Sequence, residues 1–280
     1  MVAECAVRDR ILDGAVPEGT DRIEKSGGGT FSLQSGGKVN SFAGTVKLTD
    51  WGTFNVNNGT WDLQNGTLTY EGGGWLQFFA VDFTNPGNMI VDGPLTLVGW
   101  TSLNGSSANS ITINGSGGLT LNGVVNPIQW GVDLNGGTLT GVSGLSATSD
   151  PNVLAGPIRA LADTTVISKD RMTIGGAFSM TDGKAFTKDG AGVLRLCGET
   201  SMKGTLLYAN GANVTGFVPS TTYNDARGSF KVEPGATLKM SEDGSGYGTW
   251  GHVKYCGVWV TGGSVEMSND WGVRIGQTGG

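Results

Sequence analysis

The 280-residue sequence predicts an all-β protein, a single elongated parallel β-helix (a solenoid) with a short N-terminal cap. Three observations predict this fold class. Glycine accounts for 50 residues without a period of three, so the chain is not collagen, and its share is well above the usual value of about 7%. Apolar residues alternate with polar ones in short runs, as in strands with one buried face. A seven-residue phrase also recurs along the chain, and such repeats indicate a solenoid.

The phrase is clearest in GTFNVNNGTWDLQNGTLTYEGG, residues 52–73, where a glycine stands at every seventh position. Each copy carries two apolar residues two positions apart, which share one face of a strand. These pairs are Phe54 and Val56, Trp61 and Leu63, and Leu68 and Tyr70. Two architectures fit this segment: an antiparallel meander with Asn-Gly turns, or one solenoid coil of about 21 residues with a phrase on each side.

Recurrence favours the solenoid. The phrase returns as GGTFSL, GPLTLVG, NSITING, GGLTLNG and GVDLNGGTLTG before residue 142, and as GSFKVEPGATLKM and VTGGSVEM after residue 227. A meander of so many short strands would leave one apolar face uncovered, whereas a coil buries that face against itself. We therefore expect parallel pairing between residues 52–73 and the coils on either side.

The chain divides into four expected parts: a polar cap (1–22), a first β-helix array (23–141), an irregular loop excursion (142–170) and a second β-helix array (171–280). AECAVRDRIL in the cap favours a short helix. The excursion loses the phrase and contains Pro151 and Pro157. The ending GVRIGQTGG has no capping element, so we expect the array to continue beyond Gly280 in a longer protein with an open last coil here.

A longer internal repeat joins IEKSGGGTFSLQSG at 23–36 to FTKDGAGVLRLCG at 186–198, and SFAGTVKL at 41–48 to SMKGTLLY at 201–208. The matched structural positions are Lys25 with Lys188, Gly27 with Gly190, Gly29 with Gly192, Phe31 with Leu194, Leu33 with Leu196, and Gly44 with Gly204. We expect Phe31, Leu33, Leu194 and Leu196 to be buried, in equivalent places on their coils. This module of about 30 residues, the length of one stacked unit, resembles the autotransporter-associated β-strand repeat. The resemblance implies a right-handed parallel β-helix that is exported and displayed outside a bacterial cell, and it implies no reaction.

Composition excludes several classes of function. The net charge of −6, without a basic stripe, argues against nucleic acid and anionic membranes as partners. No apolar run approaches the roughly 20 residues of a membrane helix. Residues 1–22 carry charges where the apolar core of a signal peptide would stand, so no export signal is read in this chain. Cys5, Cys197 and Cys256 form neither a disulfide framework nor a metal knuckle. We expect no metal and no cofactor.

Polysaccharide lyases and glycosidases also use β-helices, so paired carboxylates matter. Asp50 with Asp62, or Asp182 with Asp189, would be such pairs on adjacent coils, but acids at turns are expected to be solvated turn residues. His252 has no acid nearby in sequence and is a poor candidate for a general base.

Four aromatic residues near the C-terminus are the candidate glycan-stacking residues: Tyr247, Trp250, Tyr255 and Trp259. Buried ladder positions are the favoured interpretation of the same residues. The sequence thus predicts no enzyme but a structural or adhesive segment, a β-helical stalk or passenger at the cell surface or secreted. Its partners would be surface glycans or host or cell-surface proteins. The alternative is a carbohydrate-active β-helix, either a lyase, a glycosidase or a glycan-binding module.

Overall fold

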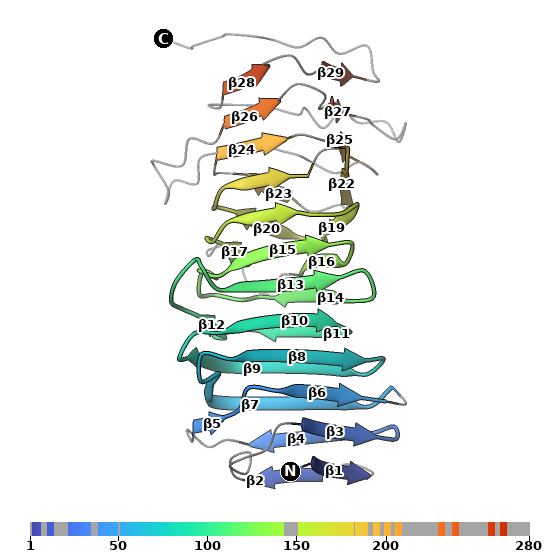
Figure 1. The fold of residues 1–280 in the computed structure, drawn as a ribbon, viewed down its shortest axis with the longest axis vertical. Coiled ribbons are helices and arrows are strands. Elements are labelled where there is room, and N and C mark those ends of the chain that lie inside the picture. The colour runs from blue at the N-terminus through green and yellow to red at the C-terminus, as the bar shows by residue number, and fades with distance from the viewer. Residues whose placement is uncertain are drawn as a thin grey trace.

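The computed structural model describes residues 2–6, 10–13, 22–34, 39–49, 51–142, 151–181, 183–189, 193–196, 199–202, 205–208, 229–232, 237–240, 257–260 and 264–267. These residues form a parallel β-solenoid, in which each coil adds one strand to each of two long sheets. In Figure 1 the strands stack along the long axis in chain order, starting from the N-terminal end at the bottom. The predicted all-β solenoid fold is therefore confirmed.

Sheet A has 12 strands. They are β1 (Val2–Ala6), β3 (Arg22–Ser26), β6 (Thr45–Leu48), β8 (Thr67–Gly72), β10 (Asn88–Asp92), β13 (Ser110–Asn114), β15 (Gly131–Asn135), β18 (Ile158–Ala160), β21 (Phe178–Met180), β24 (Glu199–Met202), β26 (Ser229–Val232) and β28 (Gly257–Val260). Partners in neighbouring coils lie 20 or more residues apart in sequence, as Ile158 and Phe178 do.

Sheet B has 14 strands. Twelve follow one another along the solenoid: β2 (Arg10–Asp13), β4 (Thr30–Gln34), β7 (Thr53–Asp62), β9 (Trp75–Thr84), β11 (Pro94–Val98), β14 (Gly118–Asn122), β16 (Thr138–Val142), β19 (Thr164–Ser168), β22 (Ala185–Asp189), β25 (Thr205–Tyr208), β27 (Thr237–Met240) and β29 (Ser264–Met267). The other two are β5 (Val39–Ser41), which pairs with the second half of β7, and β12 (Ser102–Leu103), which pairs with the second half of β9.

The third side of the solenoid begins with β5, the second halves of β7 and β9, and β12. It continues in sheet C, which consists of β17 (Val153–Leu154), β20 (Arg171–Ile174) and β23 (Val193–Leu196). The peptide N–H of Gln129 donates to the carbonyl of Leu103, and Ile128 bridges to Leu154, so these two parts are joined. Within the described residues all secondary structure is β, and no helix there is long and apolar enough to cross a membrane.

Residues 52–73 form one coil, as predicted. Phe54 pairs in parallel with Phe31 on one side and Leu76 on the other, which excludes the meander. The first phrase lies in sheet B, the second on the third side and the third in sheet A, and all six of their apolar side chains are buried. The first corner is turned at Asn58 and Gly59, both with positive φ, a conformation that glycine and asparagine adopt at low cost.

The interior is filled by stacked apolar side chains. Trp61, fully buried, meets Phe42 and Phe78 edge-on with ring centroids 5.7 and 5.3 Å apart. Its indole N–H donates to the Phe42 carbonyl at 2.9 Å, so burial leaves no unpaired polar group on this ring. Trp130 donates in the same way to the Asn104 carbonyl at 3.0 Å.

The N-terminal segment differs from the expected cap. Val2–Ala6 and Arg10–Asp13 are strands that pair in parallel with β3 and β4, so the short helix expected there is wrong. A lone helix of about ten residues is marginal in water, whereas the edge of β3 offers a backbone partner to each residue of β1. These strands add a further coil at this end.

The expected loop excursion is also wrong over residues 151–170, which contain β17, β18 and β19 within the three sheets. Residues 143–150 lie outside the described residues. Pro157 stands just before β18, where proline is tolerated because no ladder N–H is needed, and its carbonyl accepts from the N–H of Val132 at 2.8 Å. The β-structure therefore runs from the first array into the second through this segment.

The two copies of the long repeat occupy different sides of the solenoid. Phe31, Leu33 and Leu194 are buried, as predicted, but β4 belongs to sheet B and β23 to sheet C. Likewise Lys25 lies in sheet A and Lys188 in sheet B. The expectation that the two copies lie at equivalent places on their coils is therefore wrong. A strand, a glycine turn and a second strand can form any corner of a coil. The phrase therefore does not determine on which side of the solenoid it lies.

Candidate functional surface

Most of the residues predicted for glycan stacking cannot be placed. Tyr247, Trp250 and Tyr255 lie outside the described residues, together with His252 and Cys256. Trp259 belongs to β28 of sheet A, where it pairs with Lys231. Among the repeat positions, Gly190, Gly192 and Gly204 also lie outside the described residues. The glycan-stacking role of the aromatic segment stays a prediction.

Lys25 serves the interior. It faces inward between Ile23 and the corner after β3 and is only 1% exposed. Its Nζ donates to the carbonyl of Gly27 at 2.7 Å. A Cβ on Gly52 would stand 2.2 Å from this nitrogen and 2.7 Å from the backbone carbonyl oxygen of Gly27, so glycine leaves room for both the lysine and the turn that it contacts. The lysine of the repeat thus holds a turn in place, by a contact that sequence alone does not show.

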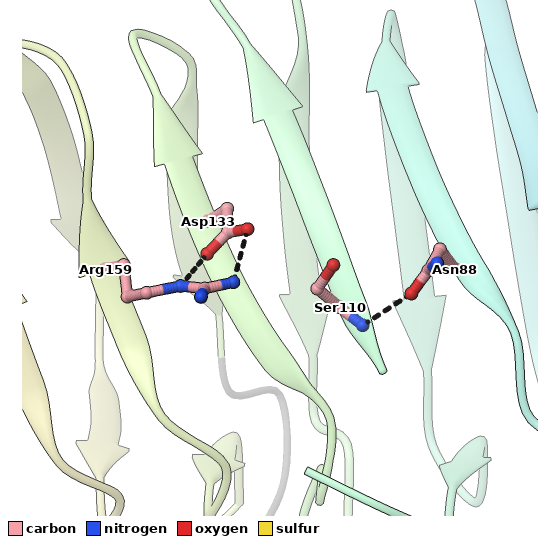
Figure 2. A network of polar contacts seen from close by, with 4 residues as sticks. All are labelled: Asn88, Ser110, Asp133 and Arg159. Atoms are coloured by element: carbon pink, nitrogen blue, oxygen red, sulfur yellow. Dashed lines mark hydrogen bonds and ion pairs between the residues drawn. The ribbon is translucent and has the colours of Figure 1, made fainter. Parts of the chain in front are cut away.

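The outward polar groups of sheet A connect neighbouring coils, as Figure 2 shows for two pairs. The guanidinium of Arg159 donates to both carboxylate oxygens of Asp133, at 2.5 and 2.7 Å, and the hydrogen bond with Asp133 raises the pKa of Arg159. The amide oxygen of Asn88 accepts from the N–H of Ser110 at 3.0 Å. The bidentate, charge-assisted contact of Arg159 orients both partners, and both pairs connect one coil to the next.

A second polar ladder lies at the end of the same strands. The side chain of Asn114 donates to Asp92 at 2.7 Å, and that of Asn135 donates to Asn114 at 3.0 Å. Three successive coils are joined in this way. The chemistry of both ladders is structural, because each acid accepts from the neighbouring coil.

Glu71 pairs directly with Asp92 across neighbouring coils of sheet A, and two further carboxylates, Asp62 and Asp82, lie near each other on the third side. Asp62 pairs with Thr84, and Asp82 pairs with Thr60. The two acids therefore lie on neighbouring coils, offset by two residues in the register. Asp62 accepts from the N–H of Gln64 at 2.7 Å and from the side chain of Asn85 at 2.9 Å. Asp82 accepts from the hydroxyl of Ser102 on the next coil.

The acid pairs named from the sequence remain untested because Asp50 and Asp182 are outside the described residues. In the part of the chain that the structure describes, no three histidine, cysteine or acidic side chains gather as metal ligands would.

The outward faces of the two long sheets differ in charge. Sheet A between β3 and β18 presents seven charged side chains: Arg22, Glu24, Lys47, Glu71, Asp92, Asp133 and Arg159. The outward positions of sheet B from β4 to β19 carry none, once the second halves of β7 and β9, which lie on the third side, are set apart. They are Thr30, Ser32, Gln34, Thr53, Asn55, Asn57, Trp75, Gln77, Phe79, Pro94, Thr96, Val98, Gly118, Thr120, Asn122, Thr138, Thr140, Val142, Thr165 and Ile167.

Three exposed tryptophans mark this uncharged face of sheet B. Trp75, 43% exposed, is the first residue of β9 and points outward, while its N–H donates to the Gly52 carbonyl at 2.9 Å. Trp51 precedes β7 at one border and Trp100 follows β11 at the other, 76% and 66% exposed. β7, β9 and β11 are consecutive strands of the sheet. Sequence reasoning missed these residues, although strand alternation places Trp75 outside.

The fold and its outer faces define the chain as a parallel β-solenoid. Comparison with models of protein families, with curated protein sequences and with solved structures found no match to this chain.

Proposed function

We propose that this protein is a non-catalytic β-solenoid that acts as a rigid stalk or adhesive segment of a bacterial surface or secreted protein. The observation that carries the proposal is the use of the outward polar groups. Asp133 with Arg159, Asp92 with Asn114, and Asp82 with Ser102 all join neighbouring coils. Side chains engaged along the axis stiffen a stack whose repeats contact only their neighbours.

Two further features support this role. The interior is packed with apolar side chains from Ile23 to Leu194, so the coils form a continuous body. The repeat that contains Lys25 and Lys188 resembles the autotransporter-associated β-strand repeat, whose setting is the outside of a bacterial cell. Surface display and adhesion to glycans or proteins come to this chain as proposals from that resemblance.

A rod can be tested by its length. Register makes Ile111 equivalent to Val132 and Ile158, so deletion of residues 111–131 or of 111–157 removes one or two coils in register. Each coil contributes about 4.8 Å to the axis. We expect the maximum dimension in small-angle scattering to fall by about 5 and about 10 Å respectively. Variants that collapse to a compact particle, or keep the full length, would refute the rod.

The carbohydrate-active alternative is favoured by acids on neighbouring coils, Asp62 with Asp82 and Glu71 with Asp92. A glycosidase needs two carboxylates about 5–10 Å apart. The chain should be incubated with neutral and acidic polysaccharides while reducing ends and unsaturated products are measured. We expect no turnover. Turnover that Asp62→Asn, Asp82→Asn, Glu71→Gln or Asp92→Asn abolishes would replace the stalk by an enzyme.

A further inference from the structure

We propose that the outward face of sheet B, between β7 and β14, binds a neutral polysaccharide, with Trp75 as the stacking residue. This inference rests on the adhesive part of the proposed function and names its partner. The face consists of the outward residues of four consecutive strands. It differs in place from the aromatic segment that the sequence pointed to.

The absence of charge on this face favours a neutral ligand. In a chain with 15% charged residues, the outward positions of sheet B from β4 to β19 are uncharged, apart from the second halves of β7 and β9 on the third side, while sheet A presents seven charges over the same coils. A charged side chain that is stripped of water by an uncharged polymer loses its hydration and gains no opposite charge in return. A face without charges avoids this cost, and it offers nothing to an anionic or cationic ligand.

The polar side chains of this face can form hydrogen bonds with sugar hydroxyl groups. Hydroxyl and amide side chains lie in register along the axis, as in Asn55, Gln77 and Thr120, with the buried Thr96 between the last two. Each donates and accepts, as the hydroxyl groups of a sugar do. The side-chain oxygen of Asn55 is buried and has no hydrogen-bond partner among the described residues.

The exposed tryptophan rings on and beside this face favour stacking with a sugar. Trp75 lies on the face, and Trp51 and Trp100 stand at its two borders on the adjoining coils. An indole offers a flat apolar surface with one polar N–H, which suits the apolar face of a sugar ring. Gln77 and Thr96 pair in the middle of the face, with Trp75 at one end of β9 and the Phe79–Val98 pair toward the other. That arrangement favours a polysaccharide over a second copy of this chain, because self-associating interfaces have a more apolar centre.

The test is co-sedimentation of the full chain with five insoluble neutral polysaccharides: cellulose, chitin, curdlan, mannan and granular starch. Pectate gel serves as the anionic comparison. We expect retention on at least one neutral polymer, unchanged between 0.15 and 1 M salt because no ion pairs are involved (about an 8 to 3 Å change in screening length). Trp75→Ala should weaken this binding about tenfold or more, as the loss of a central contact does.

Matched variants separate the face from the rest of the molecule. Gln77→Lys puts a charge in the middle of the sheet B face and should abolish retention. Thr69→Lys, at an outward half-buried position of sheet A in the preceding strand, should leave retention unchanged. Val39→Ala removes an apolar side chain that is 52% exposed on the third side and should also have no effect.

Three results would overturn the inference. One is no retention on any of the five neutral polymers, and another is retention on pectate alone that salt abolishes. The third is concentration-dependent dimerisation in light scattering that Gln77→Lys removes, which would assign the face to a second copy. None of these results changes the length of the coil-deletion variants, so the stalk and its proposed ligand fail separately.

Discussion

Gly72→Ala should destabilise the solenoid strongly, whereas the same change at the next residue should not. Gly72 ends β8 with φ +114° and lies directly over Leu48 of the previous coil. A Cβ built on Gly72 stands 1.9 Å from the carbonyl oxygen of Leu48. At Gly73 an added Cβ meets nothing within 4 Å and φ is not positive. Gly27 separates the two causes, with φ +76° but nothing within 4 Å.

The magnitudes follow from these differences. A left-handed backbone costs an L-residue about 1–2 kcal/mol, so Gly27→Ala should lower the free energy of unfolding by about that amount. Gly72→Ala has this cost and must also push a backbone oxygen away from 1.9 Å. Overpacking adds about 1–3 kcal/mol, which gives a loss of about 2–5 kcal/mol. Gly73→Ala should change stability by less than about 1 kcal/mol, in the stabilising direction, because it restricts the unfolded chain.

Urea unfolding followed by circular dichroism measures the free energies, and amide hydrogen exchange shows where stability is lost. Exchange is needed because long repeat arrays do not always unfold in one step. We expect Gly72→Ala to lower protection in β6, β8 and β10, which are consecutive strands of sheet A. If Gly72→Ala and Gly27→Ala were equally destabilising, backbone conformation alone would account for both, and the argument from coil spacing would be wrong.

Three other substitutions test the packing. Leu194→Ala should cost about 2–5 kcal/mol in urea unfolding as a core truncation; a loss below about 0.5 kcal/mol would contradict its burial. Asn152→Ala should cost about 2–5 kcal/mol, because the buried amide accepts from the N–H of Val124 and donates to the carbonyl of Val142, both at 2.9 Å; a loss like that of surface variants would show that water replaces it. Burial raises the pKa of Tyr70, so the folded state keeps the phenol proton after the unfolded chain releases it near pH 10. Stability should therefore fall above pH 10, and Tyr70→Phe should reduce that slope; equal slopes would place the phenol in water.

Alternation and repetition were sufficient to predict the fold and the interior. Phe54, Trp61 and Leu68 fall on three different sides of one coil because each phrase is a strand followed by a turn that asparagine and glycine can adopt. These are local properties, and a short stretch of sequence contains all of them.

The side on which each strand lies could not be predicted. Leu33 and Leu194 occupy similar phrases but different sheets, because the number of residues at each corner decides where the next strand pairs. The segment around Asn152 looked like a loop for a related reason. Its backbone is held by hydrogen bonds to Val124 and Val142, contacts over 10 or more residues that no local pattern reports.

Inward and outward residues of the coils are under different constraints, and this difference indicates where a binding function lies in this molecule. Stacking demands only that alternate residues be apolar and that certain corners be glycine, as at Gly52 and Gly72. The outward residues are not constrained by the core, so a consistent choice among them needs another cause. Sheet A uses its outward residues to connect coils through groups such as Asp133 and Arg159. Sheet B makes a different choice over the same coils, with hydroxyls, amides and Trp75 in place of charges. Because solubility favours charge on an exposed surface, this uncharged face is the part of the solenoid where binding to an outside partner best accounts for the sequence.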